Sequence, residues 1–376
     1  MRDSALKNPK LEAEENRLLS VVEHWLPRIE VAGIASATAR AVIQRAGVWE
    51  NWLRVWSAEG ERHADMAAEA LARGHKITAG EAYARASLFY HFGQFMAFDD
   101  LDAKAAASAS KVELFRLALP LLDPPGEIIE IPFESGILRA CLRLPHGRGK
   151  HPLAVLIPGS DSTKEEFPAF ERHFLARGIA TLSMDGPGQG EGRSLGPLRP
   201  DFASAVVAVI VAIEGRPELS GARALVGMAF GGFLALRAAA TVEKLAGVAS
   251  INGFFDLGSF WDSLPKVYQD NMTYALGGDS AERARQFTLA RSQGIAAPAL
   301  IIHGARDKIF PASEAQRCAE VCLRGAQVHV LAEGNHVCNN VPWLYRPLVA
   351  DWVADRFPTT DTPEGQSTGG LDDSPP

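Results

Sequence analysis

The chain has 376 residues, which is long enough for one large and one smaller domain, each with its own core. Its composition, 47% hydrophobic and 22% charged, is close to the average for soluble globular proteins. Its 38 Lys and Arg against 45 Asp and Glu give a formal net charge of −7, and no basic stripe occurs, which argues against nucleic acid and acidic membranes as partners. Because the sequence shows neither an apolar leader nor an apolar run of membrane-spanning length, we expect a cytoplasmic protein without a signal peptide or membrane span.

Residues from about 10 to 122 repeat their apolar positions with helical spacing, which predicts an N-terminal helical domain over residues 1–123. The pattern Thr78-Ala-Gly-Glu81 has the form of a capping box and predicts the start of a helix that includes Tyr90 and His91. We expect this domain to act as a lid, and its exposed apolar faces predict a homodimer. The repeating apolar positions are Leu18, Leu19, Val22, Trp25 and Leu26, then Trp49, Trp52, Leu53 and Trp56.

Asp123-Pro-Pro-Gly126 ends the helical pattern, and short apolar runs follow over residues 127–357. The first two runs read as a hairpin, and the later ones are continuous and alternate with helical patterns, so we expect an α/β domain with an eight-stranded, mostly parallel sheet. Residues 253–296 are a candidate cap segment, and the polar residues 358–376 predict a disordered tail. The expected strands lie near 128–133, 137–143, 152–157, 179–184, 223–228, 246–251, 298–303 and 326–331.

The residues directly after these strands form one constellation, since ligand sites of parallel sheets lie at the carboxyl ends of the strands. Gly227-Met-Ala229-Phe-Gly231 has the spacing of a nucleophile elbow, with alanine where a serine is expected. Asp307 and His336 follow later strands, and the order nucleophile, acid, histidine is that of a hydrolase triad. The backbone N–H groups of Phe230 and Ser160 are the expected oxyanion hole.

Structural interpretations compete with several of these motifs. A single Asp or His in a loop is usually structural, and only their common order and position make Asp307 and His336 catalytic candidates. Tyr90 and His91 fit a core better than a ligand site, so they are weak candidates for substrate binding. Thr163-Lys-Glu-Glu166 reads as a capping box, and Gly186-Pro-Gly-Gln-Gly190 as a structural turn rather than a dinucleotide loop.

Other residues predict no cofactor chemistry. The four cysteines are too sparse for a disulfide framework and are expected to be reduced thiols, and Cys338 is not taken as a nucleophile. We find no metal-binding motif and expect neither a metal nor an organic cofactor.

The runs Pro158-Gly-Ser-Asp-Ser-Thr-Lys-Glu-Glu166 and Asp185-Gly-Pro-Gly-Gln-Gly190, together with the N-terminal helices, resemble one branch of the α/β-hydrolase family. That branch contains 2,6-dihydroxypseudooxynicotine hydrolase and the fungal pigment-pathway hydrolases that shorten polyketides. The resemblance implies hydrolysis of a carbon–carbon bond next to a ketone in an aromatic or polyketide-like small molecule. It assigns the triad to position 229, Asp307 and His336, and this chain departs from the family at Ala229.

The alanine has two explanations, which the sequence leaves open. In one, Ala229 is an engineered substitution that inactivates a hydrolase and lets it hold an uncleaved substrate, since the other catalytic groups are present. In the other, the chain is a natural non-hydrolytic binding protein, or a lyase or cyclase that uses His336 as acid and base. The serine-bearing parent could also be a carboxylesterase or thioesterase with the same triad.

Overall fold

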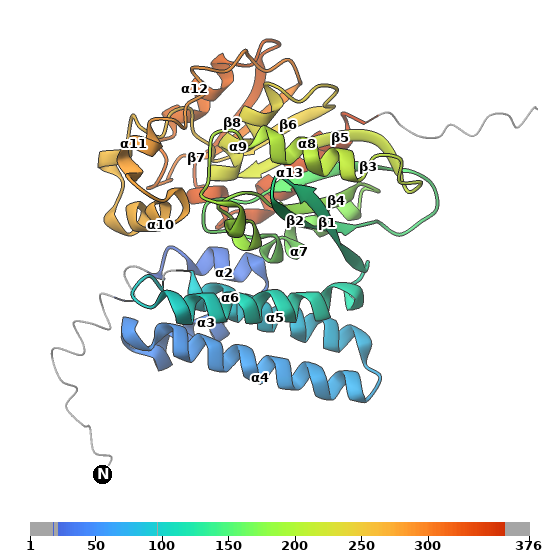
Figure 1. The fold of residues 1–376 in the computed structure, drawn as a ribbon, viewed down its shortest axis with the longest axis vertical. Helices are drawn as coiled ribbons and strands as arrows, with labels where there is room; N and C mark the ends of the chain where they lie inside the picture. The colour runs from blue at the N-terminus through green and yellow to red at the C-terminus, as the bar shows by residue number, and fades with distance from the viewer. Residues whose placement is uncertain (1–17, 19–21, 96, 358–376) are drawn as a thin grey trace, which may run out of the picture.

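The structure, a computed structural model, describes residue 18, residues 22–95 and residues 97–357. A layer of helices, α2 to α6, lies against an α/β unit in which helices cover a central sheet (Figure 1). Leu19 and the expected tail over 358–376 lie outside the described residues.

The eight-stranded sheet has the order β1-β2-β4-β3-β5-β6-β7-β8. β1 and β2 form an antiparallel hairpin, β2 runs antiparallel to β4, and the other neighbours are parallel. All eight expected strands are present, although β5 begins at Leu219 rather than near 223, and the α/β prediction is confirmed. The strands are β1 (Gly126–Phe133), β2 (Gly136–Arg143), β3 (His151–Ile157), β4 (Ala180–Asp185), β5 (Leu219–Met228), β6 (Gly247–Ile251), β7 (Ala299–Gly304) and β8 (Ala326–Leu331).

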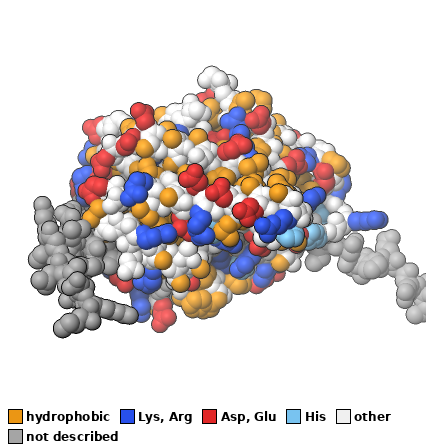
Figure 2. Space-filling model, turned by 90° about the horizontal axis from the view of Figure 1, so that it is seen from below, with side chains coloured by type: hydrophobic (Ala, Val, Ile, Leu, Met, Phe, Trp, Pro, Cys, Tyr) orange, Lys and Arg blue, Asp and Glu red, His pale blue; other side chains and the backbone are white. Residues whose placement is uncertain are grey.

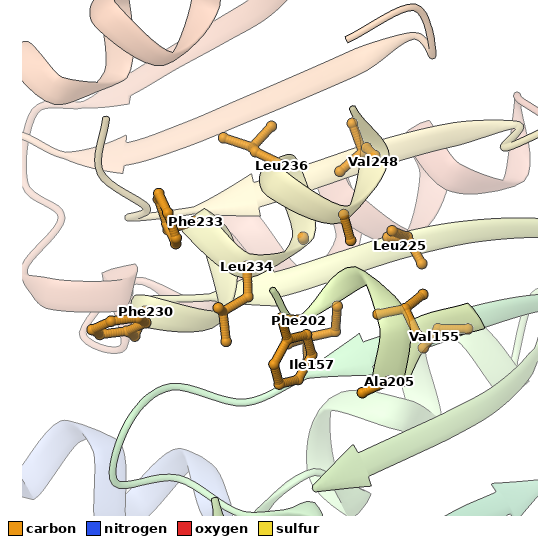
Figure 3. Packing of buried hydrophobic residues seen from close by; sticks show 14 of the residues in the cluster. Val155, Ile157, Phe202, Ala205, Leu225, Phe230, Phe233, Leu234, Leu236 and Val248 are labelled. Atoms are coloured by element: carbon orange, nitrogen blue, oxygen red, sulfur yellow. The ribbon is translucent and has the colours of Figure 1, made fainter. Parts of the chain in front are cut away.

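Helices cover both faces of the sheet. Successive side chains of a strand point to opposite faces, so the central strands contribute to two different cores. In β3, Val155 and Ile157 pack with α8 and α9, while Ala154 and Leu156 pack with α7 and α13. Figure 3 shows the first of these cores, in which Phe233 and Leu234 of α9 lie with side chains of β3 and β5. The helices of this unit are α7 (Pro168–Leu175), α8 (Ala203–Ala212), α9 (Phe230–Ala239), α10 (Lys266–Leu276), α11 (Ser280–Ala284), α12 (Ser313–Glu320) and α13 (Pro342–Ala354).

The helical layer has its own aromatic core, in which Trp52 and Trp56 lie with ring centroids 5.0 Å apart. The capping box expected at Thr78 is wrong, because the N-cap of α5 is His75, three residues earlier, and the helix begins at Lys76. The chain leaves α4 through Gly74 at φ +80°, and His75 N donates to Ala70 O, so this turn fixes the start of α5. The helices are α2 (Leu26–Ala32), α3 (Ser36–Ala46), α4 (Trp52–Ala72), α5 (Lys76–Gln94) and α6 (Leu101–Ala118).

The outer surface of this helical layer mixes charges of both signs with apolar atoms (Figure 2). Among the residues that the structure describes, no helix is both long and apolar enough to cross a membrane. The expected domain limits, cytoplasmic location and homodimer stay predictions.

Candidate active site

A sharp turn joins β5 to α9 at the edge where the parallel strands end. Only Ala229 separates the last residue of β5, Met228, from the first residue of α9, Phe230. Its backbone has φ +52° and ψ −120°. This conformation is unfavourable for a residue with a Cβ, and such strain is found chiefly at functional sites. The turn therefore presents the side chain of residue 229 at the end of the sheet.

The two elbow glycines are required by close packing. A Cβ on Gly227 would lie 1.9 Å from Gly231 O, and one on Gly231 would lie 2.1 Å from Ile157 O. Gly231 O belongs to the first turn of α9 and Ile157 O to β3, so neither oxygen can move without disturbing its helix or strand. The turn therefore tolerates only glycine at these two positions.

His336 and Asp307, which sequence analysis singled out, lie together at the same edge. Nδ1 of His336 lies 2.8 Å from Oδ2 of Asp307, whose side chain is fully buried. This contact occupies Nδ1, so the other ring nitrogen, Nε2, is left for a reacting group. His336 lines cavities together with Ala229, which places the imidazole and the elbow in one site.

The carboxylate of Asp307 is held ionised by its surroundings. Burial by itself raises the pKa of Asp307, but the charge of His336 and several hydrogen bonds outweigh burial and lower the pKa below its usual value. Asn252 donates to Oδ2 at 2.7 Å, and Ile309 N donates to Oδ1 at 2.7 Å. A charged, immobile Asp307 fixes the orientation of the His336 ring.

Asn252 is a site residue that sequence analysis missed. It stands directly after β6 and has φ +49°, so the strand-end rule that found Asp307 and His336 also points to it. Its amide does not resemble any triad member, which explains why a motif search passes over it.

One of the two predicted oxyanion donors, Phe230, stands at the start of α9, and the other, Ser160, on the loop after β3. Phe230 is the first residue of α9, and N–H groups of a first helical turn have no acceptor within the helix. On the loop after β3, a Cβ built on Gly159 would lie 3.5 Å from the Ala229 Cβ and 3.9 Å from Phe230 N. The loop that carries Ser160 thus runs past the elbow, as an oxyanion hole requires.

Two small cavities, of about 70 and 50 Å³, meet at the elbow. Both are lined by Ala229, His336, Asp161 and Arg28, and the smaller also by Ser160 and Phe230. Arg28 belongs to α2, so the helical layer supplies part of the wall of the site.

Arg28 is the centre of an ion-pair network that sequence analysis also missed. Its guanidinium binds Glu166 through two hydrogen bonds of 2.7 and 2.8 Å and Asp161 through one of 3.1 Å. Oε2 of Glu166 also lies 3.2 Å from His91 Nε2 and accepts from Ser162 Oγ at 2.6 Å. The charge of Arg28 overcomes the effect of burial and holds the pKa of Glu166 well below its usual range.

The capping box expected over Thr163–Glu166 is therefore wrong. Thr163 makes no capping hydrogen bond to the short helix that follows, and its hydroxyl instead accepts from Lys111 Nζ of α6 at 3.0 Å. Glu165 also pairs with Lys111, at 3.1 Å. These contacts with Lys111 connect the helical layer to the loop after β3. A pattern of neighbouring residues in the sequence cannot predict them, because the partners are far apart in the chain.

Tyr90 and His91 lie apart from the elbow. His91 is fully buried against Glu166 and lines none of the cavities at the elbow, whereas Tyr90 lines a larger cavity at the helical layer. Burial is the main cause that raises the pKa of Tyr90 above its usual value. Of the two weak candidates, only Tyr90 reaches a space that could receive a ligand.

The turn Gly186–Gly190 has a structural role, as expected. Gln189 donates its side-chain amide to Pro158 O and Gly159 O, at 2.6 and 3.0 Å, and its Oε1 accepts from Gly186 N. This amide fastens the oxyanion loop to the loop after β4.

All four cysteines are buried and unpaired. Burial raises the pKa of the Cys322 thiol to about 11, and burial together with the charge of Asp307 raises that of Cys338 to about 12. Cys338 is thus protonated at neutral pH despite its place near His336. Within the described part of the chain, no three His, Cys, Asp or Glu side chains are grouped so as to hold a metal ion.

Comparisons with known proteins place this arrangement in context. Residues 154–294 match the model of the alpha/beta hydrolase family. Over 315 residues the chain is 33% identical to 2,6-dihydropseudooxynicotine hydrolase of Paenarthrobacter nicotinovorans, covering 81% of this chain and 84% of that protein. It is also 33% identical over 273 residues to alpha/beta hydrolase pydG of Acremonium sp, covering 65% of this chain and 64% of that one.

Solved structures give the same result. The crystal structure of 2,6-dihydroxy-pseudo-oxynicotine hydrolase matches with a TM-score of 0.82 and 29% identity, covering 88% of this chain and 95% of that one. AbyA5 matches with a TM-score of 0.68 at 18% identity, covering 91% of this chain and 99% of the other, which is evidence of a shared fold alone.

Proposed function

The chain belongs to the α/β-hydrolase family, and on that premise we propose that its site is built to hydrolyse a carbon–carbon bond next to a ketone in an aromatic or polyketide-like substrate. Asp307 and His336 are the acid and the base, and residue 229 is the nucleophile position. The observation that carries the proposal is the strained turn at Ala229, which presents that side chain to cavities shared with His336. The relation to 2,6-dihydropseudooxynicotine hydrolase supports the choice of a ketone.

With a serine at position 229, the proposed reaction runs in two stages. The serine hydroxyl attacks the ketone carbon and gives its proton to Nε2 of His336, while the N–H groups of Phe230 and Ser160 stabilise the oxyanion. The carbon–carbon bond then breaks, and the departing carbanion takes the proton back from His336. Water, deprotonated by His336, next attacks the acyl group and releases the carboxylic acid.

With alanine at position 229 the acyl intermediate cannot form. Loss of a triad serine typically lowers turnover by about a million-fold, whereas the binding groups are untouched. We therefore propose that this form binds its substrate without cleaving it, whether the alanine is engineered or natural.

The helical layer and the segment 253–296 are proposed to enclose the substrate. Arg28 of α2 lines both cavities at the elbow, and Asn271 of α10 donates to Asp161 at 3.4 Å. Enclosure excludes water, which would otherwise protonate the departing carbanion before His336 does. We propose residues 1–123 as a lid domain and residues 127–357 as the catalytic domain.

The test is the Ala229→Ser variant assayed on aryl ketones, β-diketones and simple aryl esters. The proposal expects cleavage of ketones at a higher kcat/KM than of esters. Turnover of esters alone would instead identify a carboxylesterase. If Ala229→Ser cleaves none of these compounds, the hydrolase proposal fails. A reaction carried out by the Ala229 form would then favour the lyase alternative, and binding without turnover in both forms would favour a binding protein.

A further inference from the structure

A cavity of about 960 Å³ lies between the helical layer and the loops that follow β3 and β4. Its walls come from α5 and α6 on one side and from residues 160–163 and 188–193 on the other. Ser160, Asp161 and Asn271 line both this cavity and the smaller one at the elbow. Ser160 Oγ donates to Asn271 at 3.3 Å, and Asn271 donates to Asp161 at 3.4 Å, so these side chains form the wall between the two cavities. A substrate that reacts at residue 229 enters the large cavity only where this wall opens.

Two cationic side chains of this cavity meet at one aromatic ring. Lys104 Nζ lies 4.8 Å from the ring centroid of Tyr274, and the Arg193 guanidinium carbon lies 3.6 Å from the same centroid. Lys104 Nζ also donates to Gln94 O and Phe95 O, at 2.5 and 3.0 Å, and Arg193 donates to Tyr274 O at 2.9 Å. These contacts fix both cations at the wall of the cavity.

Neither cation forms an ion pair with a carboxylate anywhere in the described part of the chain. The acidic groups that line the cavity nearby have other partners: Asp161 pairs with Arg28, and Glu191 pairs with Lys164 and Arg116. Glu61 and Glu113, which also line the cavity, are exposed to solvent.

Burial and neighbouring cations oppose the positive charge of Lys104. Burial and then repulsion by Arg193 lower the pKa of Lys104 to about 7, with a smaller contribution from Lys111 and against the attraction of Asp161. Burial likewise lowers the pKa of Arg193. Two partly desolvated cations held near each other are costly for the free protein, and an anion between them removes that cost.

We propose that the large cavity binds a carboxylate group of the substrate between Lys104 and Arg193, while the ketone lies at residue 229. This inference rests on the proposed function for the position of the ketone, but the carboxylate site itself does not depend on turnover. Lys104 in its charged form has three N–H donors, of which two are used by backbone carbonyls, and Arg193 has five, of which one is used. The remaining donors are sufficient for a charge-assisted contact with both carboxylate oxygens.

The Ala229 protein itself is suited to the test, because it does not consume the ligand. We would titrate it by calorimetry with 4-benzoylbutyrate, an aryl ketone with a carboxylate, and with the neutral methyl ester of that acid. At about pH 6, where Lys104 is charged, the acid is expected to bind about 10- to 100-fold more tightly than the ester. Raising the pH to about 8.5 should weaken the binding of the acid and leave the binding of the ester unchanged, because Lys104 then loses its proton.

Variants of Lys104 and Arg193 test whether these two residues cause the preference for the acid over the ester. Arg193→Met and Lys104→Met should each remove most of the preference for the acid, while Lys76→Met, which removes an exposed cation from α5, should keep it. Because Lys104 also holds the carbonyl groups at the end of α5, its loss can disturb the helices, and Arg193→Met carries the test alone if Lys104→Met unfolds.

Equal affinity for acid and ester in the parent protein, including no detectable binding of either, overturns the proposal. So does a preference that survives Arg193→Met. A preference for the acid in a protein whose Ala229→Ser variant cleaves neither ketones nor esters keeps the carboxylate site and rejects the hydrolase proposal, so the two failures are distinguishable.

Discussion

His336 Nδ1 and Asp307 Oδ2 lie 2.8 Å apart although the two residues are separated by 29 positions in the chain. They meet because β7 and β8 are neighbouring parallel strands, and each residue stands on the loop that follows one of them. The carboxylate sets which ring nitrogen carries the proton and holds the ring in place.

Asp307→Asn tests this relationship. Asparagine preserves the shape but favours the wrong tautomer of His336, so in the Ala229→Ser background kcat should fall by about 10⁴-fold with little change in KM. Steady-state kinetics on the best ketone or ester substrate gives the answer. A fall of less than about tenfold would mean that Asp307 does not orient the base.

Gly231→Ala should destabilise the fold, because its Cβ would lie 2.1 Å from Ile157 O and 2.5 Å from Pro158 O. We expect a loss of about 3 kcal/mol or more in the free energy of unfolding, measured by urea denaturation. Gly159→Ala is the matched control, since its Cβ would meet atoms only at 3.5 Å and beyond, in ordinary contact. Similar losses in both variants would contradict the close packing of the elbow.

Arg28→Met should weaken the attachment of α2 to the oxyanion loop. It leaves Glu166 without its main counter-charge in a largely buried place, which costs about 3 kcal/mol in the free energy of unfolding. Adding Glu166→Gln should restore part of that loss. Removal of the exposed pair Arg285–Glu282 by Arg285→Met serves as control and should have little effect.

The ion pair between Arg28 and Glu166 also predicts that the stability of the fold depends on pH. The pKa of Glu166 is lowered in the folded protein, so its contribution is fully present above the usual pKa of 4.5 and is lost as the pH falls through the lower folded value. Arg28→Met should flatten the acid side of a plot of unfolding free energy against pH. An unchanged acid limb would argue that Glu166 is not held by Arg28.

The cysteines should react slowly with iodoacetamide at about pH 8 in the folded protein, since the thiolate is the reactive species. All four are buried, and the pKa values of Cys322 and Cys338 are raised to about 11 and about 12. Mass spectrometry should find little alkylation before denaturation and four labelled thiols after it. Rapid labelling of Cys338 alone would instead suggest a reactive thiol at the site.

Much of the fold could be predicted because its signals are local. The central strands are continuous apolar runs, because buried parallel strands are apolar on both faces, so the sequence predicts the limits of β3 and β7 to within one residue. The rule that ligands bind at strand ends then placed Ala229, Asp307 and His336 at one edge of the sheet.

Two of the misses depend on contacts between residues far apart in the sequence. Thr163 and Glu166 have the spacing of a capping box, but their partners are Lys111 and Arg28, far away in sequence. The approach of Lys104 and Arg193 to one tyrosine ring likewise arises only when the helical layer packs on the α/β unit. Spacing along the chain carries no information on such pairs.

The central claim, that residue 229 is the nucleophile position of a hydrolase site, is tested most directly by reacting the Ala229→Ser variant with an alkyl fluorophosphonate and mapping the product by mass spectrometry. We predict one phosphonyl adduct, on residue 229, that is absent from the Ala229 protein and forms far more slowly when His336→Ala is added. A folded Ala229→Ser protein that stays unmodified at residue 229 would contradict the account.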